Sequence, residues 1–415
     1  MLRTLLIIGR NFRPITPFMS VYLVEEKGFT TKDIVDRIIP WWLYSMLIFS
    51  LIVPVLVNQL GLLGSISLSV LGELLGTGLL IGMKKRSLII TVVVEILSAL
   101  RSSMIVADKR FYGESNQDRA NRYSTIRKIA GMFSSFVAQN TYCISGGCLP
   151  ALYLTIMAQG LVLGLTLLLP KEADSVVATP VSLSGISPGL LAKVFSYTGA
   201  FTLSSCFKIY IDVVLIERTG QVGRCDRMIK VMLDKVSYVF YMVSLGLVKL
   251  IGMVDKKVKV LGVVNRDKAL HGYMEGMTKI AAAVLAMPLV RWTGKNYAYT
   301  EGLCVISWIM QVVGIVALRH SNSLMHGYVS YLLSFWGSSM TIYISYNRIN
   351  EMAKEHVITI ISYVSGVSCA VHAIIDLVAR KKNLRAERRF MLYAKLGTGL
   401  FGCAAICSMI EYVQR

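Results

Sequence analysis

Three ionisable side chains lie inside the apolar runs near 62–83 and 87–107: Glu73, Glu95 and Arg101. An ionised group at the centre of a bilayer costs about 2.5–3.5 kcal/mol on insertion scales, so it persists where it faces a cavity, a partner or a ligand. Glu95 and Arg101 are six residues apart and fall on different faces of a helix. Arg101 therefore needs a partner from another helix. Either a structural pair with Glu73 or the carboxylate or phosphate of an anionic ligand would satisfy it.

The second half contains two pairs of polar residues at helical spacing and one basic cluster. Lys208 and Asp212 are four residues apart, close enough to neutralise each other on one helix face. His271 and Glu275 have the same spacing, which fits either a proton relay or an ordinary satisfied pair. The basic cluster of Arg385, Arg388 and Arg389 precedes the last apolar run and fits either a solvated helix end or the rim of an anion vestibule.

The first apolar run, near 2–24, contains two prolines three residues apart, Pro14 and Pro17, beside Arg10 and Arg13. Proline removes a backbone donor and breaks the helical ladder. Backbone groups freed at membrane depth must meet a cavity or a neighbouring helix. The alternative is a kinked helix whose arginines reach toward the membrane surface.

The elements that position these residues are predicted to be membrane-spanning helices. Hydrophobic residues make up 54% of the 415 positions and charged residues 16%, whereas soluble chains have about 25% charged residues. The mean hydropathy is +0.59. Because one span needs roughly 20 apolar residues, the chain has room for about a dozen. We predict spans near 2–24, 38–57, 62–83, 87–107, 123–141, 148–169, 190–216, 269–290, 299–318, 323–346, 356–379 and 391–412.

The spans divide into two halves. Residues 1–170 form the first, 171–189 a polar linker, and 190–415 the second half, which includes a basic insertion at about 217–268. Within the insertion, 237–254 is apolar but short and flanked by lysines. It is expected to lie in the membrane interface, with a thirteenth span as the alternative.

The net charge of +20 comes from basic residues between apolar runs, so we expect contact with a lipid bilayer and not with nucleic acid. The most basic loops, 84–86, 217–268 and 380–389, fall on one side if there are twelve spans. The positive-inside rule makes that side cytoplasmic and places both termini outside. Carriers built from two six-helix halves usually have both termini inside, so the charge pattern and the architecture disagree about orientation.

No enzyme signature is present, because the sequence lacks a P-loop, a nucleotide-binding glycine fingerprint, HExxH and GxSxG. The eight cysteines show no metal-ligand spacing. Cys143 and Cys148 fit either a disulfide or two free thiols. We therefore expect no catalytic residues, no cofactor and no metal.

Five segments resemble the reduced folate and thiamine carrier family: RPITPFMSVYL (13–23), GFTTKDIVDRIIPWWLYSMLIFSLIVPVL (28–56), RANRYSTIRKIAGMFSSFVAQ (119–139), HGYMEG (271–276) and RRFMLY (388–393). The order and spacing of the first three match those of the family, so the resemblance is strong over 10–140 and looser afterwards. The resemblance implies an all-α integral membrane protein of the major-facilitator fold, with about twelve transmembrane helices in two six-helix bundles around a central site.

The resemblance also implies roles for single residues. Arg101 falls where folate-type members have an arginine that faces the cavity, which favours an anionic substrate. Thr16 and Thr91 replace glutamates of the family, whereas Trp42 matches a stacking tryptophan of thiamine-type members. The other candidate substrate-binding residues are Tyr22, Tyr44, Tyr123, Gln139, His271, Glu275 and Arg388. The candidate gating or ion-pair residues are Glu73, Glu95, Lys208 and Asp212.

These observations predict a secondary transporter that moves a small folate-like anion across a membrane by alternating access. A transporter of thiamine or its phosphates is the alternative within this class. A membrane receptor or scaffold that no longer transports is the alternative from another class. We expect a multi-pass protein of the plasma membrane whose partners are the lipid bilayer and a small-molecule substrate.

Overall fold

The computed structural model describes residues 2–104, 117–169, 187–209, 271–286, 288–289, 297–320, 324–353, 356–382, 384 and 386–414. This part of the chain is helical and contains 11 α-helices of ten or more residues. The first half contains α1 (Leu2–Asn11), η1 (Thr16–Phe18), α2 (Met19–Val21), η2 (Tyr22–Glu26), α3 (Thr31–Asp33), η3 (Ile34–Ile38), α4 (Ile39–Gly82), α5 (Leu88–Ser103), α7 (Gln117–Ser145) and α8 (Leu149–Leu167). The second half contains α9 (Pro188–Ile209), α12 (His271–Ala281), η7 (Ala282–Ala286), α14 (Tyr297–Arg319), α15 (Leu324–Ala353), α16 (Val357–Lys381) and α17 (Ala386–Gln414).

Each predicted span overlaps at least one helix, although the first, near 2–24, is broken into α1, η1, α2 and η2. In the residues that the structure describes, the prediction of an all-helical fold is confirmed. Residues 38–57 and 62–83, predicted as separate spans, are the two segments of α4, which bends at Gly61. The segment 237–254, most of the linker and the insertion at 217–268 lie outside the described residues.

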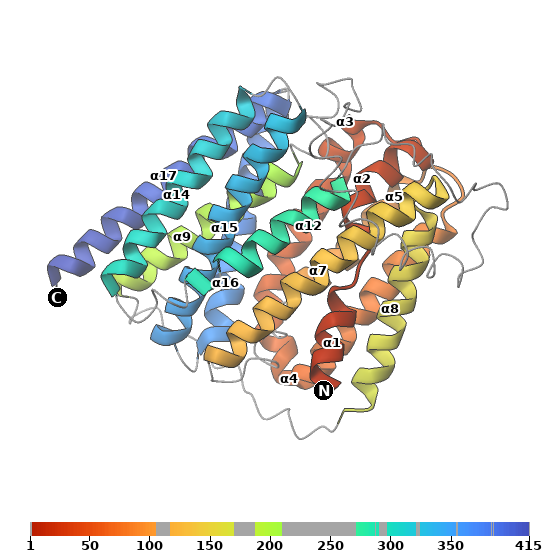
Figure 1. Cartoon of the computed structure of the whole chain (residues 1–415), viewed down its shortest axis with the longest axis horizontal. Helices are drawn as coiled ribbons and strands as arrows, with labels where there is room; N and C mark the ends of the chain where they lie inside the picture. Colours follow the sequence, from red (N-terminus) through yellow and green to blue (C-terminus); the bar gives the residue numbers. More distant parts are fainter. Residues whose placement is uncertain are drawn as a thin grey trace.

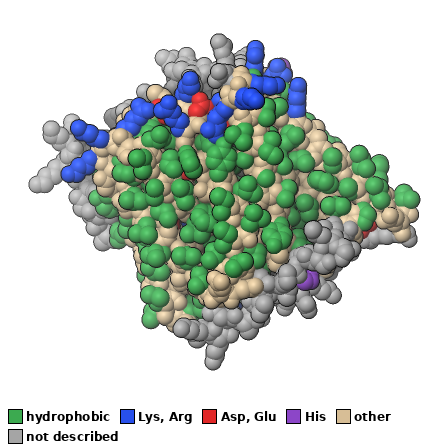
Figure 2. Space-filling view, turned by 180° about the vertical axis from the view of Figure 1, so that it is seen from behind, with side chains coloured by type: hydrophobic (Ala, Val, Ile, Leu, Met, Phe, Trp, Pro, Cys, Tyr) green, Lys and Arg blue, Asp and Glu red, His purple; other side chains and the backbone are tan. Residues whose placement is uncertain are grey.

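The outer surface is suited to lipid. Within the described residues, five helical stretches are long and apolar enough to cross a membrane: Ile34–Gly82, Leu149–Leu167, Tyr299–Arg319, Ile358–Lys381 and Met391–Gln414. Large apolar side chains such as Leu161, Ile374 and Met409 are at least 60% exposed. Figure 2 shows a broad apolar face below an edge of basic side chains. The chain is a multi-pass integral membrane protein.

The helices group according to their order in the sequence. Helices α1, α4, α5, α7 and α8 pack together, and α9, α14, α15, α16 and α17 form a second group (Figure 1). The two groups touch mainly where α4 packs on α16, and α12 lies against both α7 of the first group and α15 of the second. These contacts place residues distant in the sequence beside one another.

Two of the predicted basic loops lie at the same end of the molecule. Exposed Lys84, Lys85 and Arg86 follow α4, and exposed Lys382 follows α16. The region of α3 is at the top of Figure 1, whereas the chain termini lie at the opposite end of the bundle. We call the end that contains α3 the loop end.

Candidate functional site

The first membrane helix is broken where the sequence has its two prolines. Helix α1 ends at Asn11, and the short helix η1 begins at Thr16. The backbone amide of Arg13 donates to Ser134 Oγ on α7 at 2.7 Å. The next freed amide, that of Ile15, donates to the Thr155 hydroxyl on α8 at 3.4 Å. Neighbouring helices therefore satisfy these freed backbone groups, as the sequence predicted for a break at membrane depth.

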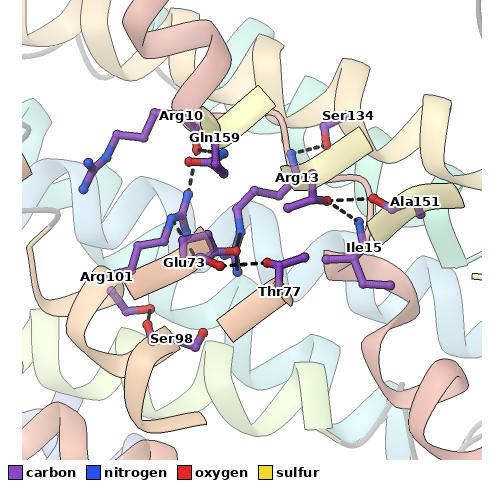
Figure 3. A network of polar contacts seen from close by, with 12 residues as sticks. Arg10, Arg13, Ile15, Glu73, Thr77, Ser98, Arg101, Ser134, Ala151 and Gln159 are labelled. Carbon is purple, nitrogen blue, oxygen red and sulfur yellow. Dashed lines mark hydrogen bonds and ion pairs between the residues drawn. The ribbon is translucent and has the colours of Figure 1, made fainter. Parts of the chain in front are cut away.

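Glu73 on α4 is the centre of a buried polar network at this break (Figure 3). Arg13 Nε donates to Glu73 Oε1 at 2.6 Å, and the guanidinium forms a second contact with the same oxygen. Arg101 on α5 approaches the other carboxylate oxygen at 3.7 Å and donates to the Arg10 carbonyl oxygen at 2.7 Å. The side chains of Glu73, Arg101 and Arg13 are only 4%, 12% and 16% exposed. One buried carboxylate thus holds two guanidinium groups from two other segments.

Arg10 contributes to this network through its backbone more than through its charge. Its carbonyl oxygen accepts from Arg101 and from Gln159 Nε2 on α8, at 2.7 and 3.4 Å. Its side chain extends away from Glu73 (Figure 3) and donates to the Ile66 carbonyl oxygen at 3.2 Å. The break in the first helix leaves this carbonyl available, because no helical turn continues beyond it.

Of the two partners that the sequence allowed for Arg101, a protein carboxylate or an anionic ligand, the structure shows the carboxylate of Glu73. Arg101 is paired with Glu73, so its positive charge has a protein partner in this conformation. Glu95 is partly buried on α5, the same helix. An anion that approaches Arg101 would compete with a carboxylate that Arg13 also holds.

Trp42 and Thr16 are both partly buried. Trp42 packs against a buried cluster of Met46, Ala99 and Cys369, which come from α4, α5 and α16. Because α16 belongs to the second group of helices, Trp42 lies where the two groups meet. Its position is compatible with the predicted stacking role, although its own contacts are apolar.

Tyr22 and Tyr123 are buried in the protein core. Tyr22 is 0% exposed, and its hydroxyl donates to the Leu80 carbonyl oxygen at 2.7 Å. Tyr123 is 3% exposed and belongs to an apolar cluster with residues such as Val57 and Ile361. In this conformation Tyr22 ties the first helix to α4, and Tyr123 contributes to packing between the helix groups.

The candidates on α12 lie at the contact with α7. Glu275 pairs with Lys279 at 2.8 Å, and Lys279 also donates to Ser135 Oγ at 2.9 Å. Near the start of α12, Gln139 Oε1 accepts from the Gly272 amide at 2.9 Å. The side chain of His271 lies outside the described residues, as do the side chain of Lys208 and the whole of Asp212.

A second ionic cluster joins the two helix groups at the loop end. Arg389 Nη1 on α17 lies 2.7 Å from Asp36 Oδ1 on η3. Arg380 on α16 donates to the Asp36 carbonyl oxygen at 2.8 Å and to the Tyr44 hydroxyl at 3.1 Å. Asp376, one turn earlier on α16, pairs with Arg380. We call these five residues the ionic latch.

Sequence reasoning identified only part of the ionic latch. It selected Tyr44 by resemblance and Arg389 only as one of three possible rim cations, of which Arg388 is exposed and Arg389 is 8% exposed. Asp376 and Arg380 are four residues apart near the end of an apolar run, and this spacing could have indicated an ion pair. Asp36 gave no comparable signal, because its partners are more than 300 residues away.

Comparison with known proteins finds one protein family that matches part of the chain. Residues 1–176 match the family model described as reduced folate carrier. The match covers the broken helix, Glu73, Arg101 and the whole of α7 and α8. No curated protein matches the chain.

Proposed function

We propose that this chain, which belongs over residues 1–176 to the reduced folate carrier family, is a secondary transporter of a small folate-like organic anion. In this proposal residues 1–170 and 190–415 are two six-helix bundles of the major-facilitator type, joined by the linker at 171–189. The bundles rock against each other around a site near the membrane midplane. The protein acts in the plasma membrane.

The observation that carries the anion preference is the sharing of Glu73 between Arg13 and Arg101. A guanidinium is permanently charged and recognises carboxylate or phosphate through paired hydrogen bonds. Arg101 Nε is 3.7 Å from Glu73, farther than an ordinary hydrogen bond. A substrate carboxylate could therefore take Arg101 while Arg13 continues to hold Glu73.

The contacts between the helix groups support alternating access. At the loop end the ionic latch connects η3 and α4 to α16 and α17. Elsewhere an apolar cluster joins Val57 and Leu62 of α4 to Ile349 and Ile358 of α15 and α16. Separate polar and apolar contacts of this kind allow one region to open while the other stays closed.

Trp42 favours a second candidate, transport of thiamine or a thiamine phosphate. Its indole is partly buried where the helix groups meet, and such a face can stack a pyrimidine or a pteridine ring. Thr16 and Thr91 provide no carboxylate for the thiazolium cation at the positions where the family has glutamate. The folate-like substrate is therefore the first choice.

The function is tested by uptake of radiolabelled folate, thiamine and thiamine diphosphate into proteoliposomes that contain the purified full-length chain. We expect saturable folate uptake that Arg101→Ala reduces at least tenfold and that Arg122→Ala, a change at an exposed arginine, leaves intact. Undiminished folate uptake by the Arg101 variant would contradict the assigned role of Arg101. Ligand-induced thermal stabilisation without flux of any substrate would instead support the receptor alternative.

A further inference from the structure

Lys128 on α7 is a cation whose surroundings differ from those of the other polar residues in the core. In the described part of the chain its ammonium forms no ion pair and no hydrogen bond, and its contact is with the ring of Phe335 on α15, 5.0 Å from the centroid. The side chain is only partly exposed. Phe335 belongs to the second group of helices, so this contact spans the two halves.

The charged neighbours of Lys128 are Arg127 on the same helix and Lys279 and Glu275 on α12. The one carboxylate among them, Glu275, is already held by Lys279 at 2.8 Å. Lys279 has further protein partners, since it donates to the Gly131 carbonyl oxygen at 3.1 Å and to Ser135 Oγ. Lys279 is thus a structural cation, whereas Lys128 contributes a positive charge that these neighbours do not neutralise.

Helical geometry directs Lys128 toward the second half of the molecule. Gly131, Ser135 and Gln139 are spaced four residues apart on α7, and each contacts α12. Lys128 precedes Gly131 by three residues and therefore lies on the same face. On α15, the ring of Phe335 lies 5.0 Å from the Lys128 ammonium.

Desolvation of an ammonium is unfavourable unless a counter-charge or a set of hydrogen bonds replaces water. A cation–π contact with a phenylalanine ring offsets only part of this desolvation cost. A negatively charged ligand bound between the two halves would offset the rest of the desolvation cost. An aromatic group of the same ligand could pack on Phe335, because aromatic rings favour offset or edge-to-face contact with one another.

We propose that Lys128 and Phe335 form an anion-binding subsite between the two halves, in which the ammonium binds a carboxylate or phosphate and the ring contacts an aromatic group of the same substrate. This inference rests on the proposed function, because it names the contact through which that carrier takes its anion. Arg101 is held by Glu73, whereas Lys128 is free to form the first ionic contact with the substrate.

The subsite is tested by equilibrium binding of folate and of thiamine diphosphate to the purified full-length chain in detergent. Lys128→Gln should weaken binding of at least one of these anions tenfold or more, and Lys128→Arg should keep affinity within threefold. Binding of thiamine, a cation, should not weaken in Lys128→Gln. These outcomes follow from loss of the charge and not of the side-chain volume.

Thermal unfolding without ligand separates a binding role from a structural one. We expect Lys128→Gln to unfold at the wild-type temperature, and the matched variant Lys279→Gln to unfold at a lower one, because it breaks the contacts with Glu275 and Ser135. Wild-type affinity in Lys128→Gln would overturn the subsite. So would a loss of stability equal to that of Lys279→Gln. If the wild-type chain itself bound neither anion, the proposed function would fail as well, which is a distinct result.

Discussion

Among single residues that the structure describes, charged side chains between the helices differ in what they contact. Glu73 and Lys279 have several protein partners and hold helices together. Lys128 has an aromatic ring as its contact and is suited to a ligand. The chemical type of a residue does not distinguish these roles, because Lys128 and Lys279 are both lysines on helices. Their partners, which come from other helices, make the distinction.

Removal of the Glu73 carboxylate should destabilise the protein strongly. Glu73→Gln leaves the guanidinium groups of Arg13 and Arg101 buried without their shared anion. Breaking a buried ion pair in this way costs about 3–5 kcal/mol. The free energy of unfolding in denaturant measures this change. As a control, Glu351→Gln removes an exposed pair with Arg348 and should change stability by less than about 1 kcal/mol. Equal effects of the two substitutions would contradict the structural role of Glu73.

The sequence indicated the importance of Arg101 and Glu73, because ionisable residues in apolar runs are few and informative. It left their partners open, since those depend on which helices become neighbours. Lys128 was not selected. It follows Arg127 in a polar stretch of α7, where a solvated helix end explains a lysine equally well.

At the scale of elements, the turn before α4 depends on a short capping motif at the loop end. The amide of Thr30 donates to Asp33 Oδ2 at 3.1 Å, and the Asp33 amide donates to the Thr30 hydroxyl at 3.1 Å. This reciprocal arrangement is a capping box at the start of a helical stretch. Arg86 lies 2.9 Å from the same carboxylate, which joins the start of α3 to the loop after α4.

The Asp33 carboxylate should make stability depend on pH in the acid range. The hydrogen bond from the Thr30 hydroxyl lowers the pKa of Asp33 below its usual value, against the opposing effect of burial. The Thr30 amide and then the charges of Arg86 and Arg37 lower this pKa further. A lowered pKa means that the stabilisation is present above the unfolded-state pKa of about 3.9 and is lost as pH falls through the folded-state pKa. Thermal unfolding from pH 6 to pH 2 should therefore show a smaller acid-induced loss in Asp33→Asn than in wild type. Identical profiles would contradict this assignment.

The bend in α4 depends on a glycine conformation. Gly61 has φ 70° and ψ 177°, a conformation that side chains other than glycine rarely adopt. Gly61→Ala should destabilise the protein by about 1–3 kcal/mol through backbone strain. Gly78, a helical glycine on the same element with open space where a Cβ would lie, is the matched control. Gly78→Ala should stabilise by about 0.5–1 kcal/mol, as measured by denaturant unfolding. If the free energy of unfolding of Gly61→Ala equalled that of wild type, the bend would tolerate a side chain.

Apolar run lengths predicted most helices to within a few residues, because a bilayer restricts both length and composition. They could not predict that Tyr22–Glu26 winds as a π-helix or that α15 extends to Ala353, seven residues beyond the expected span. Such details depend on neighbouring helices and on polar residues that leave the membrane. The break at Pro14 and Pro17 was predicted because proline acts locally.

At the scale of the whole molecule, the ionic latch should control opening between the halves at the loop end. Asp36→Asn removes the carboxylate that faces Arg389 and should favour separation there. The side chain of Val35 packs against the core of the second half. In a variant that lacks the eight native cysteines, Val35→Cys introduces a single thiol that becomes accessible when this end opens. We expect its reaction with a membrane-impermeant maleimide to become at least fivefold faster in Asp36→Asn.

The exchanged pair Asp36→Arg with Arg389→Asp is the control for the ionic latch. It restores opposite charges across the interface and should return the labelling rate toward that of the parent protein. A rate that does not change in Asp36→Asn would show that other contacts keep this end closed. If the exchanged pair were labelled as fast as Asp36→Asn, charge complementarity would not be what keeps this end closed.

The central claim is that the two halves enclose a site for a small organic anion and carry that anion across the membrane. The most direct measurement is folate flux into proteoliposomes by wild type, Arg101→Ala, Lys128→Gln and Arg122→Ala, with the protein amount matched. We expect saturable flux in wild type and Arg122→Ala, and at least a tenfold loss in Arg101→Ala and Lys128→Gln. Saturable flux that is equal in all four proteins would contradict it.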